Sequence, residues 1–374
     1  MTPLLLITSG FLLVYILLIA YLYTGWWRLR LFQKKGAEEL LSITVVVALR
    51  NEGHNISALL TDLCQQNYPE GDLEIRLVND HSTDNTVEQI NHYLKHYPGN
   101  IPIYLHDNPA EGKKAALSIG IQHSRSAWIV TTDGDCRFPK NWLRTLMGFR
   151  KASTRMLLGP VKVAPASFGF GQLQAFEFLS LIGFTASAIG HGHPILANGA
   201  NLAFERATFL ALGGYGDDPL ASGDDVLLLH RMQKAYPNSV RYASDCAAMV
   251  ATPPATSWQQ FWQQRIRWAS KSKYYRNRMA LVMGGFLALF NVLLVLLVLC
   301  WPIVAYPWPY IAGILGIKLS AEILFIFPMA YHWKQVALLG WAFPFQIFNP
   351  LYITFVGIRS IGGGFYWKGR KHRA

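Results

Sequence analysis

The sequence predicts an α/β domain with a mostly parallel sheet, joined to transmembrane helices at both ends. Between residues 41 and 249, β-branched runs alternate with amphipathic stretches, which is typical of a mostly parallel sheet. Uncharged apolar runs of about 20 residues, enough to span a bilayer, lie on both sides of this region. Hydrophobic residues make up 52% of the 374 positions, in agreement with a membrane-embedded part.

The net charge of +12 is concentrated beside the apolar runs. Residues 25–35, 256–278 and 359–374 contain no acid but hold 15 of the 34 lysines and arginines. Elsewhere, 19 basic residues are outnumbered by 22 acidic ones. Basic residues next to apolar spans suit anionic lipid headgroups on a cytoplasmic face, each contributing on the order of 1 kcal/mol. The charge therefore indicates a membrane partner and argues against nucleic acid.

The first apolar run, residues 3–23, is followed rather than preceded by positive charge. A cleaved signal peptide has the opposite arrangement. We therefore expect a retained anchor over residues 1–25, with its N-terminus outside and the next domain in the cytoplasm.

The four cysteines show no metal-ligand spacing and are expected to be reduced thiols.

Polar loops follow the first two expected strands. Residues 43–49 form a continuous β-branched strand that runs into the loop 50–55, and residues 74–78 form a second strand that ends at Asn79 and Asp80. A carboxylate directly at a strand end, such as Asp80, can accept from a base or a ribose. The helix after the first strand is predicted to turn four apolar side chains inward: Ile56, Leu59, Leu60 and Leu63.

Two segments of this region have competing interpretations. Residues 82–86 are explained mostly by loop and capping chemistry, with Ser82 or Thr83 as the cap of the following helix. Lys113 comes after a short strand at 101–106 and opens a helix, where a cation opposes the helix dipole unless an anion shares the site. The alternative for Lys113 is a solvated surface pair with Lys114.

The segment 128–135 combines a buried strand with two carboxylates. Its apolar, β-prone residues end abruptly in Asp133-Gly134-Asp135, at the sheet edge where α/β proteins bind ligands. Two carboxylates separated by one small residue can share a divalent cation with substrate phosphates. Asp-Gly-Asp is also ordinary turn chemistry, so this pattern alone leaves both interpretations open.

Seven segments in order resemble the motif set of the family 2 inverting glycosyltransferases of GT-A fold, and more narrowly the membrane-bound branch with ceramide glucosyltransferases and the cellulose and hyaluronan synthases. The resemblance covers about residues 40 to 270. The segments are VVVALRNEGHN (45–55), LVNDHSTDNT (77–86), EGKKAAL (111–117), TTDGDC (131–136), ANGANLAFER (197–206), SGDDVLLLHR (222–231) and QQRIRW (263–268).

The resemblance implies a role for each matching residue. Asp133 and Asp135 correspond to the DxD that holds Mg²⁺ or Mn²⁺ and the diphosphate, and Asp225 of the Asp224-Asp225 pair corresponds to the general base. Asp224 stands where the family more often has Glu, and Asn79 where it often has Asp. The remaining implied contacts are to nucleotide from Asn51, Glu52, Asp80, Lys113 and Asp133, and to diphosphate or acceptor from Asn198, Gln264, Arg267 and Trp268.

The chemistry also follows from the residues themselves. Sugar transfer from a nucleotide diphosphate needs a base that deprotonates the acceptor hydroxyl, and Asp225 can serve as one. It also needs the leaving diphosphate to be stabilised by a metal and cationic donors, and Asp135, Gln264 and Arg267 fit this second role. The competing interpretation of Asp224-Asp225 is charge compensation at a helix N-terminus.

Residues 256–278 are expected to form a basic, aromatic helix lying in the membrane interface and docking on the catalytic domain of residues 40–255. Gln264 and Arg267 fall on one face of it because they are three residues apart.

Upstream, His191 and His193 could ligate a metal, order a loop or contact the acceptor.

Membrane segments are expected over residues 279–358, followed by a basic cytoplasmic tail at 359–374. Residues 282–304 and 308–327 are clear spans, and Glu322 inside the second must face protein or a polar path. The run 336–358 is broken by prolines and polar residues. We expect it to be re-entrant or interfacial, because a full span would leave the basic tail outside.

The sequence thus predicts an integral-membrane, metal-dependent inverting glycosyltransferase with its catalytic domain facing the cytoplasm. Its expected partners are a nucleotide-sugar donor, the membrane, and a lipid or lipid-linked glycan acceptor. A processive polysaccharide synthase is an alternative enzyme. A catalytically silent nucleotide-binding or lipid-binding scaffold is an alternative of another class.

Overall fold

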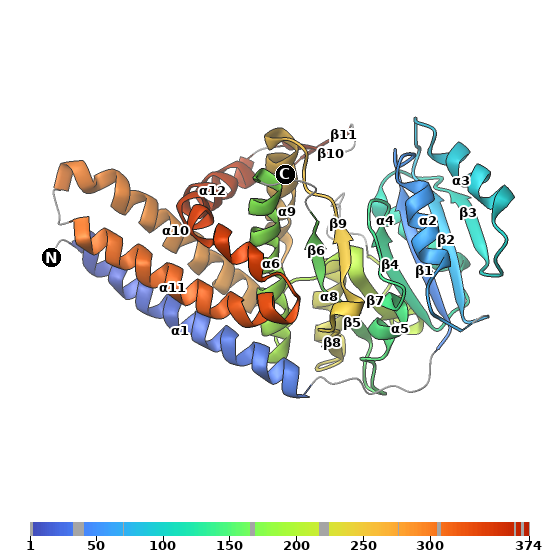
Figure 1. The fold of residues 1–374 in the computed structure, drawn as a ribbon, viewed down its shortest axis with the longest axis horizontal. Helices are drawn as coiled ribbons and strands as arrows, with labels where there is room; N and C mark the ends of the chain where they lie inside the picture. Colours follow the sequence, from blue (N-terminus) through green and yellow to red (C-terminus); the bar gives the residue numbers. More distant parts are fainter. Residues whose placement is uncertain are drawn as a thin grey trace. The chain divides into compact units, whose positions relative to one another are not determined.

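A computed structural model of the chain divides into two compact units (Figure 1). An α/β unit contains residues 29–164 and 192–253, and a helical unit contains residues 1–28, 165–191 and 254–374. The structure describes residues 3–32, 41–69, 71–164, 169–216, 224–275, 277–304, 308–362, 364–367 and 370–373.

The α/β unit is built on a seven-stranded sheet with the strand order β3-β2-β1-β4-β7-β5-β8. The four strands from β3 to β4 are parallel, and β7 joins β4 in the antiparallel direction. The predicted α/β class with a mostly parallel sheet is therefore confirmed. Its strands are β1 (Ile43–Leu49), β2 (Leu73–Asn79), β3 (Ile103–Asp107), β4 (Trp128–Asp133), β5 (Met156–Leu158), β7 (Leu202–Glu205) and β8 (Val240–Tyr242), beside a separate pair, β6 (Val161–Val163) and β9 (Val250–Thr252).

Strand β1 is apolar along most of its length and lies between covered sheet faces. All residues of β1 except Ala48 are buried, as expected for a parallel strand between helices. Helix α4 approaches β1 closely at Gly120, where an added Cβ would lie 2.4 Å from Val46 Cγ1. The helices of this unit are α2 (Ile56–Cys64), α3 (Thr86–His96), α4 (Lys113–His123), α5 (Trp142–Met147), α7 (Arg206–Ala211) and α8 (Asp224–Ala235).

Helix α2 confirms its predicted inward face, since Ile56, Leu59, Leu60 and Leu63 are all buried. Burying an aliphatic side chain of this size contributes about 1.5–3 kcal/mol.

The predicted cap of α3 is wrong. Asp84 Oδ1, rather than Ser82 or Thr83, accepts a hydrogen bond from the backbone N–H of Thr86 at 3.0 Å. Asp84 sits two residues before the helix, within reach of its first free N–H.

The helical unit contains long apolar helices. Five helices of the described residues are long and apolar enough to cross a membrane, and they lie within Pro3–Leu31, Phe170–Gly190, Arg278–Ile303, Trp308–His332 and Val336–Ser360. The elements of the unit are α1 (Pro3–Phe32), α6 (Phe170–Gly190), α9 (Trp258–Ser270), α10 (Arg278–Val304), α11 (Trp308–His332), α12 (Ala342–Gly362) and a hairpin of β10 (Gly364–Trp367) and β11 (Arg370–Arg373).

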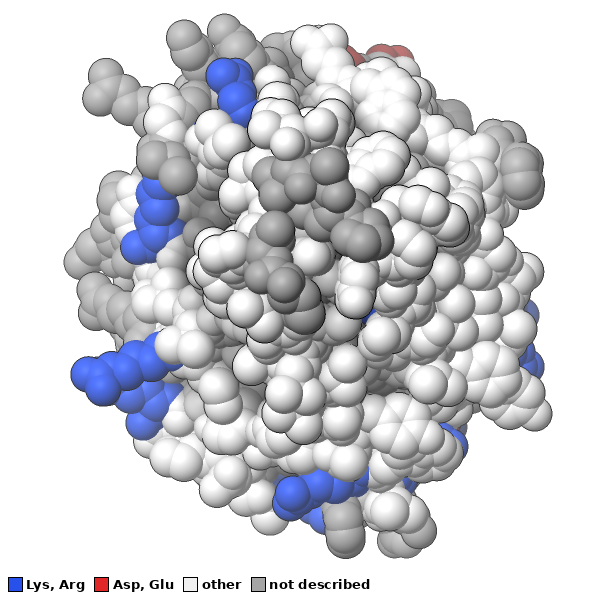
Figure 2. Space-filling model, turned by 90° about the vertical axis from the view of Figure 1, so that its left-hand side faces the viewer, with Lys and Arg blue, Asp and Glu red and all other residues white. Residues whose placement is uncertain are grey.

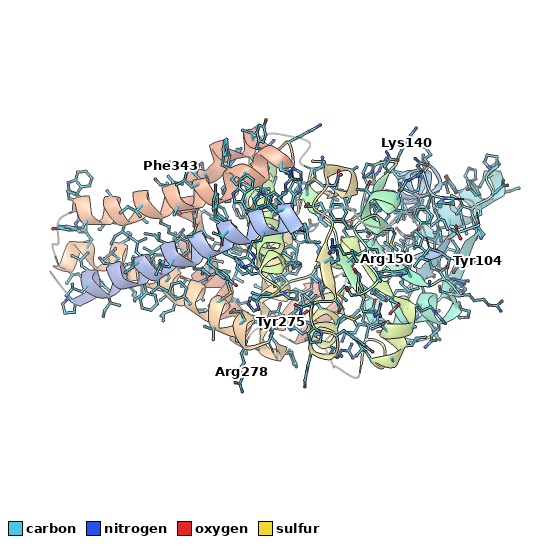
Figure 3. All side chains as sticks on the ribbon, turned by 90° about the horizontal axis from the view of Figure 1, so that it is seen from below. Tyr104, Lys140, Arg150, Tyr275, Arg278 and Phe343 are labelled. Atoms are coloured by element: carbon cyan, nitrogen blue, oxygen red, sulfur yellow. The ribbon has the colours of Figure 1, made fainter. Side chains whose placement is uncertain are left out.

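Helices α1, α10 and α11 run side by side in Figure 1 and share a core. Phe11 of α1 stacks on Phe286 of α10, with ring centroids 5.5 Å apart. Their outer faces carry many exposed large apolar side chains, including Leu17, Leu299 and Leu324. Figure 2 shows a face that is almost free of charged side chains, with Lys and Arg toward its rim. Arg278, labelled in Figure 3, is exposed at the start of α10.

A buried polar cluster interrupts these apolar helices. Lys318 Nζ lies 2.6 Å from Glu322 Oε1 on the same helix, and it donates to Gln346 Oε1 on α12 at 2.8 Å. Tyr15 of α1 donates its O–H to Glu322 Oε1 at 2.5 Å. The Lys318 side chain is only 1% exposed. Glu322 therefore faces protein, as the sequence predicted.

Two segments of the helical unit differ from what the sequence predicted. The sequence placed residues 170–190 inside the 40–255 domain, but α6 belongs to the helical unit, where Gly183 packs against Met329 and Phe176 against Phe345. Residues 342–362 form one helix, α12, despite Pro350 inside it. The interfacial or re-entrant placement of this segment stays a prediction.

Candidate active site

The loops after β1, β2, β3 and β4 meet at one edge of the sheet. These strands are parallel, and their registers align Ala48 with Asp133, Leu49 with Asn79, and Asn79 with Asp107. The carboxyl edge of an open parallel sheet is where α/β proteins bind ligands. The fold therefore brings the predicted polar strand ends together.

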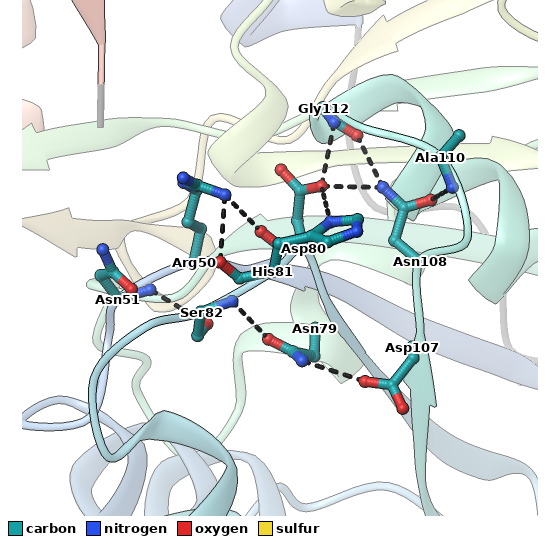
Figure 4. A network of polar contacts seen from close by, with 10 residues as sticks. All are labelled: Arg50, Asn51, Asn79, Asp80, His81, Ser82, Asp107, Asn108, Ala110 and Gly112. Carbon is teal, nitrogen blue, oxygen red and sulfur yellow. Dashed lines mark hydrogen bonds and ion pairs between the residues drawn. The ribbon is translucent and has the colours of Figure 1, made fainter. Parts of the chain in front are cut away.

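Asp80 is held rigidly at this edge (Figure 4). Its side chain is buried, and its Oδ1 accepts hydrogen bonds from Asn108 Nδ2 at 2.8 Å and from the backbone N–H of Gly112 at 2.9 Å. Gly112 has φ 100°, a left-handed conformation that favours glycine. The Asp80 carboxylate thus links the end of β2 to the loop that opens α4.

The loops after β1 and β2 are tied to each other. Arg50 donates to the carbonyl oxygens of Asp80 and His81 at 2.9 and 3.1 Å (Figure 4). Asn51 donates its backbone N–H to Ser82 Oγ at 3.1 Å. Asn51 and His81 both have positive φ, 54° and 58°, a strained backbone that often marks functional loops.

Glu52 has a packing role that the sequence did not predict. Its side chain is buried and accepts from Asn55 Nδ2 at 2.7 Å. A Cβ added to Gly134 would lie 2.9 Å from Glu52 Cγ, so Glu52 packs directly against the Asp-Gly-Asp turn. Its contact with nucleotide stays a prediction.

Lys113 faces the first carboxylate of that turn. Its Nζ lies 2.5 Å from Asp133 Oδ1, and the two side chains are 17% and 40% exposed. Asp133 is thus an anion that offsets the unfavourable position of Lys113 at the start of α4. The pair places a cation and a carboxylate side by side at a partly solvated edge.

The residues of the turn fit a hard divalent cation. One ligand atom each from Asp133, Asp135 and Cys136 lies within 4.8 Å of the others. Burial and the neighbouring charges of Asp133 and Asp135 raise the pKa of the Cys136 thiol. The two carboxylates are the ligands suited to Mg²⁺ or Mn²⁺, whereas a thiol suits softer metals.

Asp225 is linked to the same strand through one loop. Its Oδ2 accepts from the backbone N–H of Gly199 at 3.1 Å. Thr131 of β4 donates its hydroxyl to the Gly199 carbonyl oxygen at 3.0 Å, and Thr132 does so to Ala200 at 2.9 Å. Two threonines of the strand that ends at Asp133 thereby hold the loop on which Asp225 rests.

Two interpretations of this region can be compared with the contacts. Asp225 Oδ1 also accepts from the backbone N–H of Val226 in the first turn of α8. The same carboxylate therefore compensates the positive end of its helix and contacts Gly199. The Asp224 side chain lies outside the described residues. Asn198 Oδ1 accepts from the backbone N–H of Ala200 at 3.0 Å and caps the short turn at Gly199–Asn201.

The motif residues Gln264, Arg267 and Trp268 lie on α9 of the helical unit. They are half-buried. The Trp268 ring packs near Phe178, with centroids 6.0 Å apart. Their contacts with diphosphate or acceptor stay predictions.

His191 makes contacts that fit its loop-ordering interpretation. Its ring stacks on Tyr21 with centroids 3.8 Å apart, and its Nε2 lies 2.7 Å from the Tyr21 carbonyl oxygen and 3.2 Å from Thr24 Oγ1. These contacts fasten the end of α6 to α1.

Two polar residues of the helical unit escaped the sequence interpretation. Arg265 was counted with the interfacial basic residues, but it is only 2% exposed and paired with Glu177 of α6. The signal was available: Glu177 is an acid inside an apolar helix, which requires a partner.

The comparisons with known proteins agree with this fold. The model of Glycosyl transferase family 2 matches residues 44–195, and that of Glycosyl transferase family group 2 matches residues 128–345, more than half of the chain. The chain aligns over 92% of its length with 99% of a mannosyltransferase from Pyrobaculum calidifontis solved with GDP-Man and Mn²⁺, at 18% identity and a TM-score of 0.56. This likeness supports the fold.

Two curated relatives align with the chain over similar lengths. The probable glycosyltransferase YdaM of Bacillus subtilis (strain 168) is 28% identical over 251 residues, 64% of this chain and 57% of its own. The poly-beta-1,6-N-acetyl-D-glucosamine synthase of Staphylococcus aureus (strain COL) is 25% identical over 237 residues, 63% of this chain and 55% of its own. The chain thus spans just over half the length of these relatives, and the family match identifies it as a glycosyltransferase of family 2 with a GT-A fold.

Proposed function

We propose that this glycosyltransferase moves a sugar, with inversion, from a nucleotide-diphosphate donor to a hydroxyl of a lipid-linked acceptor at a membrane. The observation that carries the proposal is the connection of Asp225 to β4: the strand that ends at Asp133 holds, through Thr131 and Gly199, the loop that binds the Asp225 carboxylate. One site then contains a candidate base and a candidate diphosphate-binding turn.

On the donor side, Asp80 and the loops around it would hold the nucleoside. Its Oδ1 is already bonded to Asn108 and Gly112. The Asp80 carboxylate is the candidate acceptor for a base or ribose. A divalent cation held by Asp133 and Asp135 would neutralise the diphosphate as it leaves. Lys113, placed beside Asp133, adds positive charge at the same edge.

On the acceptor side, Asp225 would accept the proton of the attacking hydroxyl. Its two carboxylate oxygens each accept one backbone N–H, which fixes the plane of the carboxylate. A carboxylate is the acceptor that this proton transfer needs. Fixed geometry of this kind lets one base contribute about 10²–10⁴-fold to the rate.

The membrane part of the proposal is supported by the five apolar helices and their exposed apolar faces. An acceptor anchored in lipid would present its hydroxyl next to such helices. The test is nucleoside-diphosphate release by the purified protein in lipid nanodiscs, across a panel of nucleotide sugars and lipid acceptors, with and without a chelator. Metal-dependent release that needs one donor and one acceptor supports the proposal. Nucleotide binding without release from any pair favours the silent scaffold.

A processive polysaccharide synthase is the second candidate, favoured by the likeness to a polysaccharide synthase of Staphylococcus aureus. The two candidates differ in product length. Sizing the labelled product of the same assay separates them, because single transfer adds one sugar per acceptor and processive synthesis yields long chains at low acceptor consumption.

Replacing Arg267 with alanine is expected to lower turnover by about 10²-fold, because a guanidinium that stabilises the leaving diphosphate is lost. Arg267→Lys, which keeps the charge but not the planar fork, should retain part of the rate. Turnover is measured by release of nucleoside diphosphate at saturating donor. A wild-type rate for Arg267→Ala would remove this residue from the mechanism.

A tag at Ala374 is expected to be accessible from the cytoplasm, because the basic tail should stay on the side of the catalytic domain. Protease or antibody access is compared in sealed vesicles of known orientation. A tag at Met1 serves as the opposite-side control, since the N-terminus is proposed to lie outside. A tail that shares the side of Met1 would contradict the re-entrant or interfacial placement of residues 336–358.

A further inference from the structure

Arg265 lies inside the segment 264–268 but points away from solvent. Its guanidinium Nε lies 3.1 and 3.2 Å from the two carboxylate oxygens of Glu177, and its NH2 also donates to Glu177 Oε2. Tyr352 of α12 donates its O–H to Glu177 Oε1 at 2.7 Å. One buried ion pair therefore connects α6, α9 and α12 inside the helical unit.

The same guanidinium contacts two of the predicted motif residues. Arg265 donates through its NH1 to Gln264 Oε1. Its Cζ lies 4.5 Å from the centroid of the Trp268 ring and 4.3 Å from that of Phe261, within the range of cation–π contacts. Arg265 thus touches the first and the last residue of the Gln264-x-x-Arg267-Trp268 pattern.

Apolar packing alone does not account for a fixed orientation of α9. Aromatic rings join it to α12, as in Trp262 with Phe355 at 4.8 Å and Phe261 with Tyr352 at 5.7 Å. Aromatic pairs adopt several ring geometries of similar energy, so they fix the orientation of a helix less sharply than a hydrogen-bonded ion pair does. A guanidinium–carboxylate pair is directional. It also costs desolvation energy, so its retention in a core points to a role in specificity rather than in stability.

We propose that Arg265 is the positioning residue of this motif, held by Glu177 and Tyr352 and orienting the side chains of Gln264 and Trp268. The proposal rests on the proposed function, because it assigns these side chains a part in sugar transfer. Arg265 itself is completely committed to protein contacts on this account and touches no substrate.

The test compares Arg265→Lys and Tyr352→Phe with wild type in nanodiscs. Lysine keeps the charge beside Glu177 but cannot also bind Gln264 and stack on Trp268. We expect kcat to fall about 10-fold to 10²-fold through misplacement of the motif, with the donor KM within twofold. Tyr352→Phe keeps the ring and removes one hydrogen bond, so it should change kcat in the same direction by less.

A second readout follows the orientation of Trp268 without turnover. Protein labelled with 5-fluorotryptophan gives a ¹⁹F resonance for Trp268, assigned by its loss in Trp268→Phe. This resonance should shift in Arg265→Lys. The matched control is Glu322→Gln, which breaks a second buried ion pair among the described residues of the unit, away from the motif. It should lower the melting temperature but leave kcat and the Trp268 resonance unchanged.

The outcomes separate the two proposals. An unchanged kcat and an unchanged Trp268 resonance in folded Arg265→Lys would overturn the positioning role. The role would also be overturned if Glu322→Gln changed kcat and the Trp268 resonance as much as Arg265→Lys does, because both variants would then act by loosening the helical unit in general. If wild-type protein releases no nucleoside diphosphate with any pair, the proposed function fails. The resonance shift still decides in that case whether Arg265 orients Trp268.

Discussion

Replacing Asp225 with asparagine is expected to lower sugar transfer by roughly 10²–10⁴-fold while donor affinity stays within a few-fold of wild type. An amide cannot take the proton of the acceptor hydroxyl. The donor contacts proposed for Asp80, Lys113 and Asp133 are untouched by the change. Transfer is measured as product formation at saturating donor and acceptor, and donor affinity by titration calorimetry.

The variant should remain folded, because asparagine can keep one of the two backbone contacts of Asp225. Its oxygen can accept from either Gly199 or Val226, but its NH₂ cannot replace the second acceptor. We expect a lower melting temperature from the loss of one hydrogen bond, about 1 kcal/mol. Asp72→Asn, just before β2 at the opposite sheet edge, is the control and should keep full activity. Unchanged turnover in Asp225→Asn would exclude it as the base.

Replacing Asp135 with asparagine is expected to lower turnover by about 10²–10³-fold, through weaker charge stabilisation of the diphosphate. The amide removes one of the two anionic ligands of the candidate cation site but keeps its size. Donor binding in this variant should lose its dependence on metal. Binding of Mn²⁺ to the protein with nucleotide is followed by electron paramagnetic resonance.

Wild type treated with a chelator is the reference for this variant. Nucleotide affinity in chelator should be equal for wild type and Asp135→Asn, because the substitution then removes nothing that the donor uses. Restoring metal should raise affinity only in wild type. Activity of wild type that survives complete metal removal would contradict the assignment of Asp133 and Asp135 as metal ligands.

The sequence was sufficient for the parts of the fold that depend on local pattern. The β-branched run of β1 and the spacing of Ile56, Leu59, Leu60 and Leu63 each allow one structure that buries the apolar atoms. Once the strands are parallel, their carboxyl ends must share an edge. The proximity of the polar residues after β1, β2 and β4 then follows from topology.

Contacts between distant segments could not be obtained in this way. Periodicity shows that residues 170–190 form an apolar helix, but it does not show whether a helix packs on a sheet or on other helices. Arg265 falls in a basic, aromatic segment, and its burial depends on Glu177, 88 positions earlier. Thr131 reaches Gly199 across 68 positions. Such pairings depend on side-chain geometry in three dimensions, which a one-dimensional pattern does not contain.

The Lys318–Glu322 contact has a consequence for biogenesis in the proposed membrane setting. The two residues are four positions apart on α11, so the helix carries a charge together with its counter-charge. A neutralised pair reduces the penalty for entering the bilayer as a single helix, before any neighbour is present. Tyr15 lies on α1, which is synthesised before α11, and Gln346 lies on α12, which is synthesised after it, so their hydrogen bonds can form later, within the lipid. Insertion of α11 would then be independent of its assembly with α1 and α12.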